Sequence, residues 1–272
     1  MRPAAESERA ELSPNSALSA SGSASWPMAT PPVPHLTAAQ MADVDRRTVR
    51  YGISLLQMME LAGRNLAEHA RWMLGGSVSG RKLVVLCGTG NNGGGGMVSA
   101  RHLHGWGAKV YGVLVGAEAN LKPVPERQWR ILKRLGLAAT TKAAPTLGRL
   151  DLIVDALFGY GFHGRMRPQA ARWIEWAIGQ RSPTLALDVP SGLDATTGIP
   201  SRSTIRATST LTLALPKTGL RAPGAAAHVG HLYLADIGIP FEVYRDLGLE
   251  VVNLFEKGPI LRLAKEEESP KP

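Results

Sequence analysis

Two aspartates in the sequence stand directly after short apolar runs of the kind that form buried strands. Asp155 follows Leu-Ile-Val, and Asp188 follows Leu-Ala-Leu. A carboxylate in such a position is costly to bury unless it is hydrogen-bonded, ion-paired or bound to a metal. A single aspartate after a strand is often only the cap of the next helix. Because two occur at corresponding positions, each near glycines, we expect a functional site.

The polar side chains around these aspartates offer oxygen ligands. Asn92 can supply an amide oxygen, Asp155 a carboxylate and Ser191 a hydroxyl. Hard oxygen ligands suit an alkali or alkaline-earth cation better than zinc. Asp188 is then available as a general acid/base. Lys217 follows a further predicted strand, and the sequence favours two interpretations of it equally. It either places positive charge beside a phosphate or a reacting ring, or it is a surface lysine in a turn.

A glycine-rich segment, residues 88–96, lies between a predicted strand at 82–87 and a predicted helix at about 97–104. We expect its glycines to permit positive φ angles and to let backbone N–H groups approach a ligand closely. The N-terminus of the following helix attracts anions. The segment therefore predicts a site for a phosphorylated nucleotide. It contains G-x-G-x-x-G, but an NAD dehydrogenase needs an acid at the end of the second strand, and Glu118 lies beyond that end.

The elements that must position these residues alternate between strands and helices. Two capping boxes, Thr37-x-x-Gln40 and Ser54-x-x-Gln57, predict the starts of two opening helices. Strands are predicted at 82–87, 109–115, 152–157, 184–189, 208–215 and 232–235, and further helices at about 97–104, 125–135 and 169–178. Such alternation implies parallel strands joined by crossover helices. We therefore predict a single, doubly wound α/β domain with a mostly parallel sheet.

The composition restricts the class of protein and its compartment. The chain of 272 residues carries 31 Lys and Arg against 22 Asp and Glu, a net charge of +9. Because the basic residues are spread along the chain, we interpret this charge as a solvated surface that attracts small anions, and not as a nucleic-acid interface. No apolar run approaches the roughly 18 residues that cross a bilayer. The single cysteine, Cys87, favours a core position and a reducing compartment such as the cytoplasm.

Both ends of the sequence lack the pattern of a folded domain. Residues 1–35 are rich in Ala, Ser and Pro, and residues 265–272 are strongly polar. Segments of this composition bury too little apolar surface to offset the entropy lost on ordering. We therefore predict two disordered tails around one domain at residues 36–264.

The motifs described above resemble those of the NAD(P)H-hydrate epimerases, the YjeF N-terminal domain family. The resemblance covers roughly residues 36–245. It rests on segments in the family's order that read LTAAQM at 36–41, MELAG at 59–63, GNNGG at 90–94, DALFG at 155–159, DVPSG at 188–192 and PKTG at 216–219. It implies a Rossmann-like, three-layer α/β/α fold and an isomerase that interconverts the R and S epimers of hydrated NADH and NADPH (NADHX and NADPHX). The centre that inverts is C6 of the nicotinamide ring.

The resemblance also implies roles for individual residues. Potassium would be held by Asn92, Asp155 and Ser191, and Asp188, with Lys217, is our candidate for catalysis. The implied substrate contacts are Asn91, Asn92, Gly93, Gly94, Gly95, Gly159, Tyr160, Gly161, Phe162, His163, Gly164, Arg165 and Asp188. The partners implied are a second copy of the chain, in a homodimer, and a separate NAD(P)H-hydrate dehydratase. Inversion proceeds either by expulsion of the C6 hydroxyl by the ring nitrogen or by ring opening at C6.

One position departs from the family's pattern. The family's loop reads Asn-Asn-Gly-Gly-Asp-Gly, and Gly95 stands here in place of the aspartate. The loss of this carboxylate motivates an alternative function, namely a catalytically impaired nucleotide-binding or interaction module on the same fold.

Overall fold

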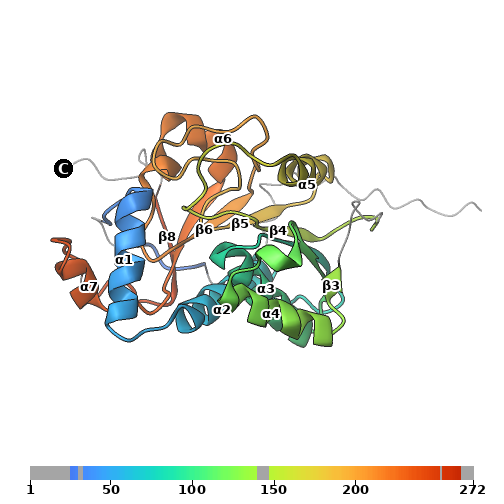
Figure 1. The fold of residues 1–272 in the computed structure, drawn as a ribbon, viewed down its shortest axis with the longest axis horizontal. Coiled ribbons are helices and arrows are strands. Elements are labelled where there is room, and N and C mark those ends of the chain that lie inside the picture. The colour runs from blue at the N-terminus through green and yellow to red at the C-terminus, as the bar shows by residue number, and fades with distance from the viewer. Residues whose placement is uncertain (1–24, 30–32, 140–146, 252, 265–272) are drawn as a thin grey trace, which may run out of the picture.

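A twisted sheet forms the centre of the molecule (Figure 1). The computed structural model describes residues 25–29, 33–139, 147–251 and 253–264. Within them, eight strands pair in the order β3-β2-β1-β4-β5-β6-β7-β8. All neighbouring pairs are parallel except the last, because β8 runs antiparallel to β7. The predicted mostly parallel sheet is therefore confirmed.

The bounds of the elements follow the predicted alternation closely. The strands are β1 Lys82–Cys87, β2 Lys109–Leu114, β3 Ala138–Ala139, β4 Leu152–Ala156, β5 Thr184–Leu187, β6 Ser209–Leu213, β7 His231–Ala235 and β8 Ile260–Arg262. The α-helices are α1 Ala38–Arg50, α2 Leu55–Met73, α3 Asn91–Gly105, α4 Pro123–Arg134, α5 Pro168–Gly179, α6 Ala226–Val229 and α7 Phe241–Arg245. Both predicted capping boxes are present, at the starts of α1 and α2.

Helices cover both faces of the sheet, as the alternating contacts of β1 show. Leu83 and Val85 belong to a core cluster with side chains of α2, α3 and α4, whereas Val84 and Leu86 belong to one with side chains of α5. Figure 1 shows α2, α3 and α4 together on one side of the sheet and α5 on the other. The three-layer α/β/α architecture is thus confirmed.

The order of the strands reverses beside β1. The chain passes from β1 to β2 on one side, while β4 pairs with β1 on the other. In open α/β sheets the crevice at such a switch point, outside the carboxyl ends of the strands, is where ligands bind. The ends of β1, β4 and β5 carry the residues singled out from the sequence, so the fold gathers them at this crevice.

Some elements differ from the sequence-based expectation. The short edge strands β3 and β8 were not predicted. Part of the predicted tail at residues 1–35 is ordered, since the backbone N–H of Ala29 donates to the carbonyl of Arg262 at 2.9 Å and Trp26 packs beside His69 and Trp72. The remainder of the predicted tails, residues 1–24, 30–32 and 265–272, lies outside the described residues.

Candidate active site

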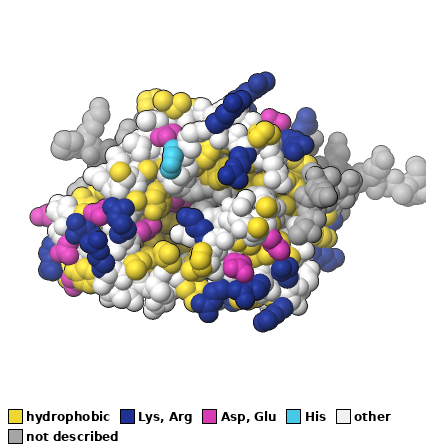
Figure 2. All heavy atoms as spheres, viewed as in Figure 1, with side chains coloured by type: hydrophobic (Ala, Val, Ile, Leu, Met, Phe, Trp, Pro, Cys, Tyr) yellow, Lys and Arg dark blue, Asp and Glu magenta, His cyan; other side chains and the backbone are white. Residues whose placement is uncertain are grey.

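A cavity of about 740 Å³ opens at the carboxyl ends of the central strands. Figure 2 shows this face of the molecule hollowed near its centre, with Lys and Arg side chains around the hollow. Of the predicted substrate-binding residues, those that line the cavity are Asn91, Asn92, Gly95, Gly159, Tyr160, Gly161, Phe162, His163, Arg165 and Asp188. Gly93, Gly94 and Gly164 are not among the lining residues. The structure therefore brings most of the predicted set to one place.

The glycine-rich segment has a different structure from the one predicted. Helix α3 begins at Asn91 and not near residue 97, so Gly93–Gly96 form its first turns. None of the glycines in the segment has a positive φ. They are required for close packing instead: a Cβ on Gly93 would lie 1.8 Å from the carbonyl oxygen of Gly88, and one on Gly96 would lie 2.5 Å from the Cβ of Ala156. Tertiary packing has overridden the poor helix propensity of glycine.

This packing places the N-terminus of α3 at the edge of the cavity. Gly90 caps the helix without a side-chain hydrogen bond, and Gly90, Asn91 and Asn92 line the cavity. The first N–H groups of a helix have no partners within it and carry a partial positive charge. An anion-binding end thus faces the cavity even though the glycines act differently from the prediction.

Asp155 and Ser191, from neighbouring strand ends, form one buried network. The hydroxyl of Ser191 donates to Asp155 Oδ1 at 2.6 Å, and the Ser191 backbone N–H donates to Oδ2 at 2.8 Å. The Leu157 N–H donates to Oδ1 at 3.3 Å. Despite these bonds, burial raises the pKa of Asp155 from 3.8 to about 6. The carboxylate is therefore satisfied by neutral donors alone.

Asn92 lies at the same edge of the sheet but contacts different groups. Its side-chain amide donates to the carbonyl of Leu187 at 3.2 Å. A Cβ on Gly159 would lie 3.1 Å from Asn92 Oδ1 and 2.7 Å from Asp188 Oδ2, so only glycine fits between these two side chains. The three predicted potassium ligands thus stand at the adjoining ends of β1, β4 and β5, with Asp155 and Ser191 in direct contact.

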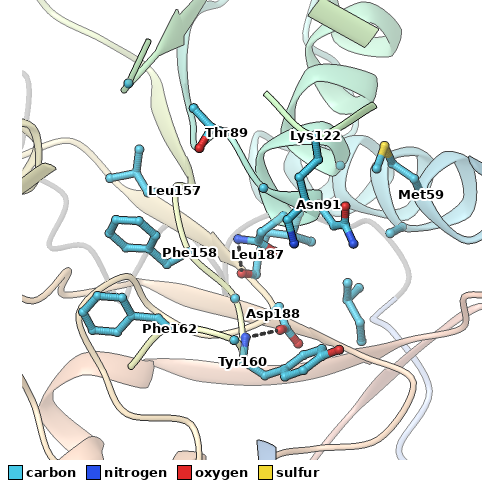
Figure 3. Close-up of a pocket in the computed structure, with 18 of the residues that line it drawn as sticks. Met59, Thr89, Asn91, Lys122, Leu157, Phe158, Tyr160, Phe162, Leu187 and Asp188 are labelled. Carbon is cyan, nitrogen blue, oxygen red and sulfur yellow. Dashed lines mark hydrogen bonds between the residues drawn. The ribbon is translucent and has the colours of Figure 1, made fainter. Parts of the chain in front are cut away.

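Asp188 is held in a fixed orientation by its backbone and by three neighbours. Its φ of 68° lies in the left-handed region, which is uncommon for a residue other than glycine. Lys217 Nζ and, at 3.5 Å, the hydroxyl of Thr212 donate to Oδ1, while the backbone N–H of Tyr160 donates to Oδ2 at 2.8 Å (Figure 3). Strained residues of this kind concentrate at functional sites.

Lys217 is a buried residue and not a surface lysine. Its exposed fraction is 0%. Besides Asp188, its Nζ donates to the carbonyl of Leu213 at 2.8 Å and to the hydroxyl of Thr212 at 3.3 Å. An ammonium has three donors, so all three have acceptors within the protein. Lys217 therefore fixes the position and charge of Asp188.

Asp45 is a cavity residue that the sequence-based reasoning missed. It lies on α1 and accepts a hydrogen bond from the hydroxyl of Tyr160. Burial raises its pKa above the ordinary value, an effect that the Tyr160 hydrogen bond partly offsets. One signal was available in the sequence: Asp45 is four residues after Met41 and adjacent to Val44, so it falls beside the buried stripe of the helix.

Aromatic and basic side chains complete the wall of the cavity. The rings of Phe158 and Phe162 stack with their centroids 4.8 Å apart, and Figure 3 shows them on the same side of the cavity. Lys122, Arg165 and Arg167 also line it. The cavity therefore combines an apolar surface with positive charge, which suits a ligand that carries both a ring and phosphates.

Comparisons with known proteins agree with this geometry. Residues 55–219 match the family model described as "YjeF-related protein N-terminus". The chain is 40% identical over 235 residues to a protein of Dehalogenimonas lykanthroporepellens named NAD(P)H-hydrate epimerase, covering 86% of this chain and 94% of that one. It is 39% identical over 214 residues to the bifunctional NAD(P)H-hydrate repair enzyme Nnr of Moorella thermoacetica, covering 75% of this chain and 40% of that enzyme.

A solved structure shares the fold. The crystal structure of the yeast protein YNL200c superimposes with a TM-score of 0.72 at 25% sequence identity, covering 85% of this chain and 100% of the yeast chain. The two chains therefore share the α/β fold over most of their length.

Proposed function

The chain belongs to the family of YjeF-related N-terminal domains, and we propose from this premise that it is an NAD(P)H-hydrate epimerase. Its reaction is the interconversion of the R and S epimers of NADHX and NADPHX at C6 of the nicotinamide ring. The observation that carries the proposal is the Asp188–Lys217 pair, which is buried at the base of a basic cavity at the switch point of the sheet.

Asp188 is the acid/base in this proposal. The C6 carbon bears both a hydroxyl and the ring nitrogen, so a proton must pass to or from the C6 oxygen for the centre to open and close. Lys217 and the Tyr160 N–H hold the Asp188 carboxylate in one orientation, which keeps it ready to exchange that proton. General acid/base catalysis of this kind typically contributes about 10²–10⁴-fold.

The nucleotide part of the substrate has two suitable surfaces. The N-terminus of α3 offers unpaired N–H groups to a phosphate, and Lys122 and Arg165 add positive charge at the cavity wall. The stacked rings of Phe158 and Phe162 offer an apolar face to a planar ring. Binding energy from these contacts would hold C6 at Asp188.

Potassium fits the residues at the ends of β1, β4 and β5. The Asp155 carboxylate is fully buried and takes part in no salt bridge of the described residues. With Asn92 and Ser191 it presents a carboxylate, an amide and a hydroxyl oxygen, the donor types that a hard cation prefers. A bound potassium ion would supply the positive charge that Asp155 lacks and would hold the three loops together.

The assembly and setting of the enzyme are also part of the proposal. Among the described residues, no helix is long and apolar enough to cross a membrane. We propose a homodimer in the cytoplasm that acts alongside a separate dehydratase for the hydrated nucleotide.

The impaired-module alternative has no supporting observation: Gly95 lines the cavity, and a Cβ there would meet only the flexible end of Leu187, at 2.9 Å.

Chromatographic separation of the two epimers tests the proposed activity directly. We expect the purified protein to interconvert R- and S-NADHX, and Asp188→Asn to lower the rate by about 10²–10⁴-fold because Asn cannot exchange the proton. Asp194→Asn is a matched control, since Asp194 follows the same strand but bonds to Thr196 and Thr197 and does not line the cavity. A wild-type protein without activity would contradict the proposed function, and an unchanged rate in Asp188→Asn would remove Asp188 from it.

A further inference from the structure

A second carboxyl group, that of Asp45, lines the cavity and is connected to Asp188 through Tyr160. Asp45 and Asp188 are the two acidic residues among those that line the cavity. Asp188 comes from the end of β5, at the sheet, whereas Asp45 comes from helix α1, between α7 and the sheet in Figure 1. The cavity thus has carboxyl groups from two separate elements.

Tyr160 connects these two groups through hydrogen bonds. Its backbone N–H donates to Asp188 Oδ2, and its side-chain hydroxyl donates to Asp45 Oδ2. Figure 3 shows the hydroxyl at the far end of the ring from the hydrogen bond with Asp188. Tyr160 therefore links the two carboxyl groups, one through its backbone and the other through its side chain.

The two carboxyl groups also differ in their charge environment. Asp188 is ion-paired with a buried ammonium. Among the described residues, the side chain of Asp45 has one hydrogen-bond partner, the neutral hydroxyl of Tyr160. Burial is the largest influence on the pKa of Asp45 and raises it, while the Tyr160 hydrogen bond and the charge of Lys217 offset part of this rise. Asp45 is accordingly suited to carry a proton, whereas Asp188 has the ammonium of Lys217 beside it.

When inversion at C6 proceeds by expulsion of the hydroxyl, protons must be exchanged on both faces of the ring. A hydroxyl that leaves one face needs a proton, and the water that adds to the other face must lose one. A single carboxylate on one side serves only one of these events. We propose that Asp45 is a second catalytic acid/base, and that it serves the face of the bound ring opposite to that served by Asp188.

The proposed step rests on the epimerase function. Protonated Asp45 gives its proton to the C6 hydroxyl, the C6–O bond breaks, and water leaves while the lone pair of N1 forms a C6=N1 double bond. A second water adds to C6 from the other face, and the C6=N1 electron pair returns to N1. That water gives its extra proton to Asp188. Proton exchange with solvent then returns Asp188 and Asp45 to their starting states, and the reverse reaction uses Asp188 as the acid and Asp45 as the base.

Exchange of the C6 oxygen with solvent water distinguishes proton transfer on one face of the nicotinamide ring from proton transfer on the other. The enzyme is incubated with each pure epimer of NADHX in H₂¹⁸O, and both inversion and ¹⁸O at C6 are followed by chromatography with mass spectrometry. In Asp45→Asn we expect inversion to fall by about 10²–10⁴-fold. The epimer whose hydroxyl faces Asp188 should still gain ¹⁸O with its configuration retained, because Asp188 can expel and re-add water on its own face.

Two further variants separate catalysis from structure. Asp43→Asn is the matched control, because Asp43 lies on the same helix but pairs with Arg46 and Arg47 and does not line the cavity; it should invert at the wild-type rate. Asp45→Ala should recover inversion when formate is added, since formate supplies a carboxylate in the vacated space. A merely structural role for Asp45 would give no such rescue.

Three outcomes would overturn the inference. The first is inversion by Asp45→Asn at the wild-type rate. The second is a parallel loss of inversion and oxygen exchange from both epimers, which would mean that Asp45 serves neither face selectively. The third is the absence of formate rescue in Asp45→Ala. If the wild-type protein neither inverts nor exchanges oxygen, the proposed function itself fails, and this result is distinguishable from all three.

Discussion

Two buried aspartates stand at the ends of neighbouring strands, yet the protein compensates their charges differently. Asp188, after β5, is paired with the ammonium of Lys217, which is itself fully buried. Asp155, in β4, receives only neutral N–H and O–H groups, two of them from Ser191. Burial raises the pKa of Asp155 to about 6, the result of a carboxylate without a positive neighbour.

The position of an acid at a strand end does not define its role. The role depends on the group that balances the charge of the acid. An ion-paired carboxylate such as Asp188 is complete without another ligand and can exchange protons with a substrate. A buried carboxylate solvated by neutral donors, such as Asp155, is complete only when it is protonated or when a cation binds. The same sheet edge therefore supports both acid/base chemistry and a cation site.

Removal of Lys217 should have the largest effect on this arrangement. We expect Lys217→Met to lower the free energy of unfolding by about 3–5 kcal/mol, because it leaves the Asp188 carboxylate buried and unpaired. The double variant with Asp188→Asn should recover part of the loss. Urea denaturation measures both. Lys133→Met is the control, because its exposed pair with Glu118 is screened by solvent and contributes little to stability. An equal loss of unfolding free energy in Lys217→Met and Lys133→Met would contradict the proposed dependence of Asp188 on Lys217.

Asp155 should make the stability depend on pH in the absence of potassium. In the folded protein the Asp155 carboxyl group keeps its proton up to about pH 6, whereas in the unfolded chain it releases the proton near pH 3.8. The folded state then binds more protons between these values, so stability falls as the pH rises through them. Two pKa units correspond to about 3 kcal/mol.

The measurement is urea denaturation from pH 4 to pH 7 in tetramethylammonium chloride. Because other groups titrate in this range, the quantity to follow is the difference in the free energy of unfolding between the wild type and Asp155→Asn. That difference should shift by about 2 kcal/mol against the wild type as the pH rises from 4 to 7. A difference that stays constant with pH would show that Asp155 is charged in the fold without a cation.

The strands and the acids at their ends could be predicted because both depend on local sequence. Apolar runs such as 152–154 and 185–187 form buried strands regardless of distant contacts. The start of α3 could not be predicted in this way. Its first turns are glycines, which disfavour a helix, and they are helical because Gly93 packs on Gly88 and Gly96 on Ala156. Such contacts exist only in the folded chain.

The chemistry of the site was likewise predictable only in part. Four residues could be singled out because they stand at or shortly after the ends of predicted strands, namely Asn92, Asp155, Asp188 and Ser191. The burial of Lys217 depends on Asp188, 29 positions away, and nothing local distinguishes it from a surface lysine. Asp45 was missed because an acid on an amphipathic helix is usually solvent-exposed, and its partner Tyr160 is 115 positions away.

Potassium itself should give the smallest of the expected effects and should separate the two aspartates most directly. At about ten times its dissociation constant, a cation that binds only the folded state adds about 1.4 kcal/mol to stability. We expect potassium chloride at pH 7 to raise the melting temperature of the wild type and of Asp188→Asn above that in tetramethylammonium chloride of equal ionic strength. Asp155→Asn should not respond, because its neutral amide cannot balance the cation's charge. If Asp155→Asn responded as the wild type does, potassium would bind elsewhere, and the buried Asp155 would have to be neutral in the working protein.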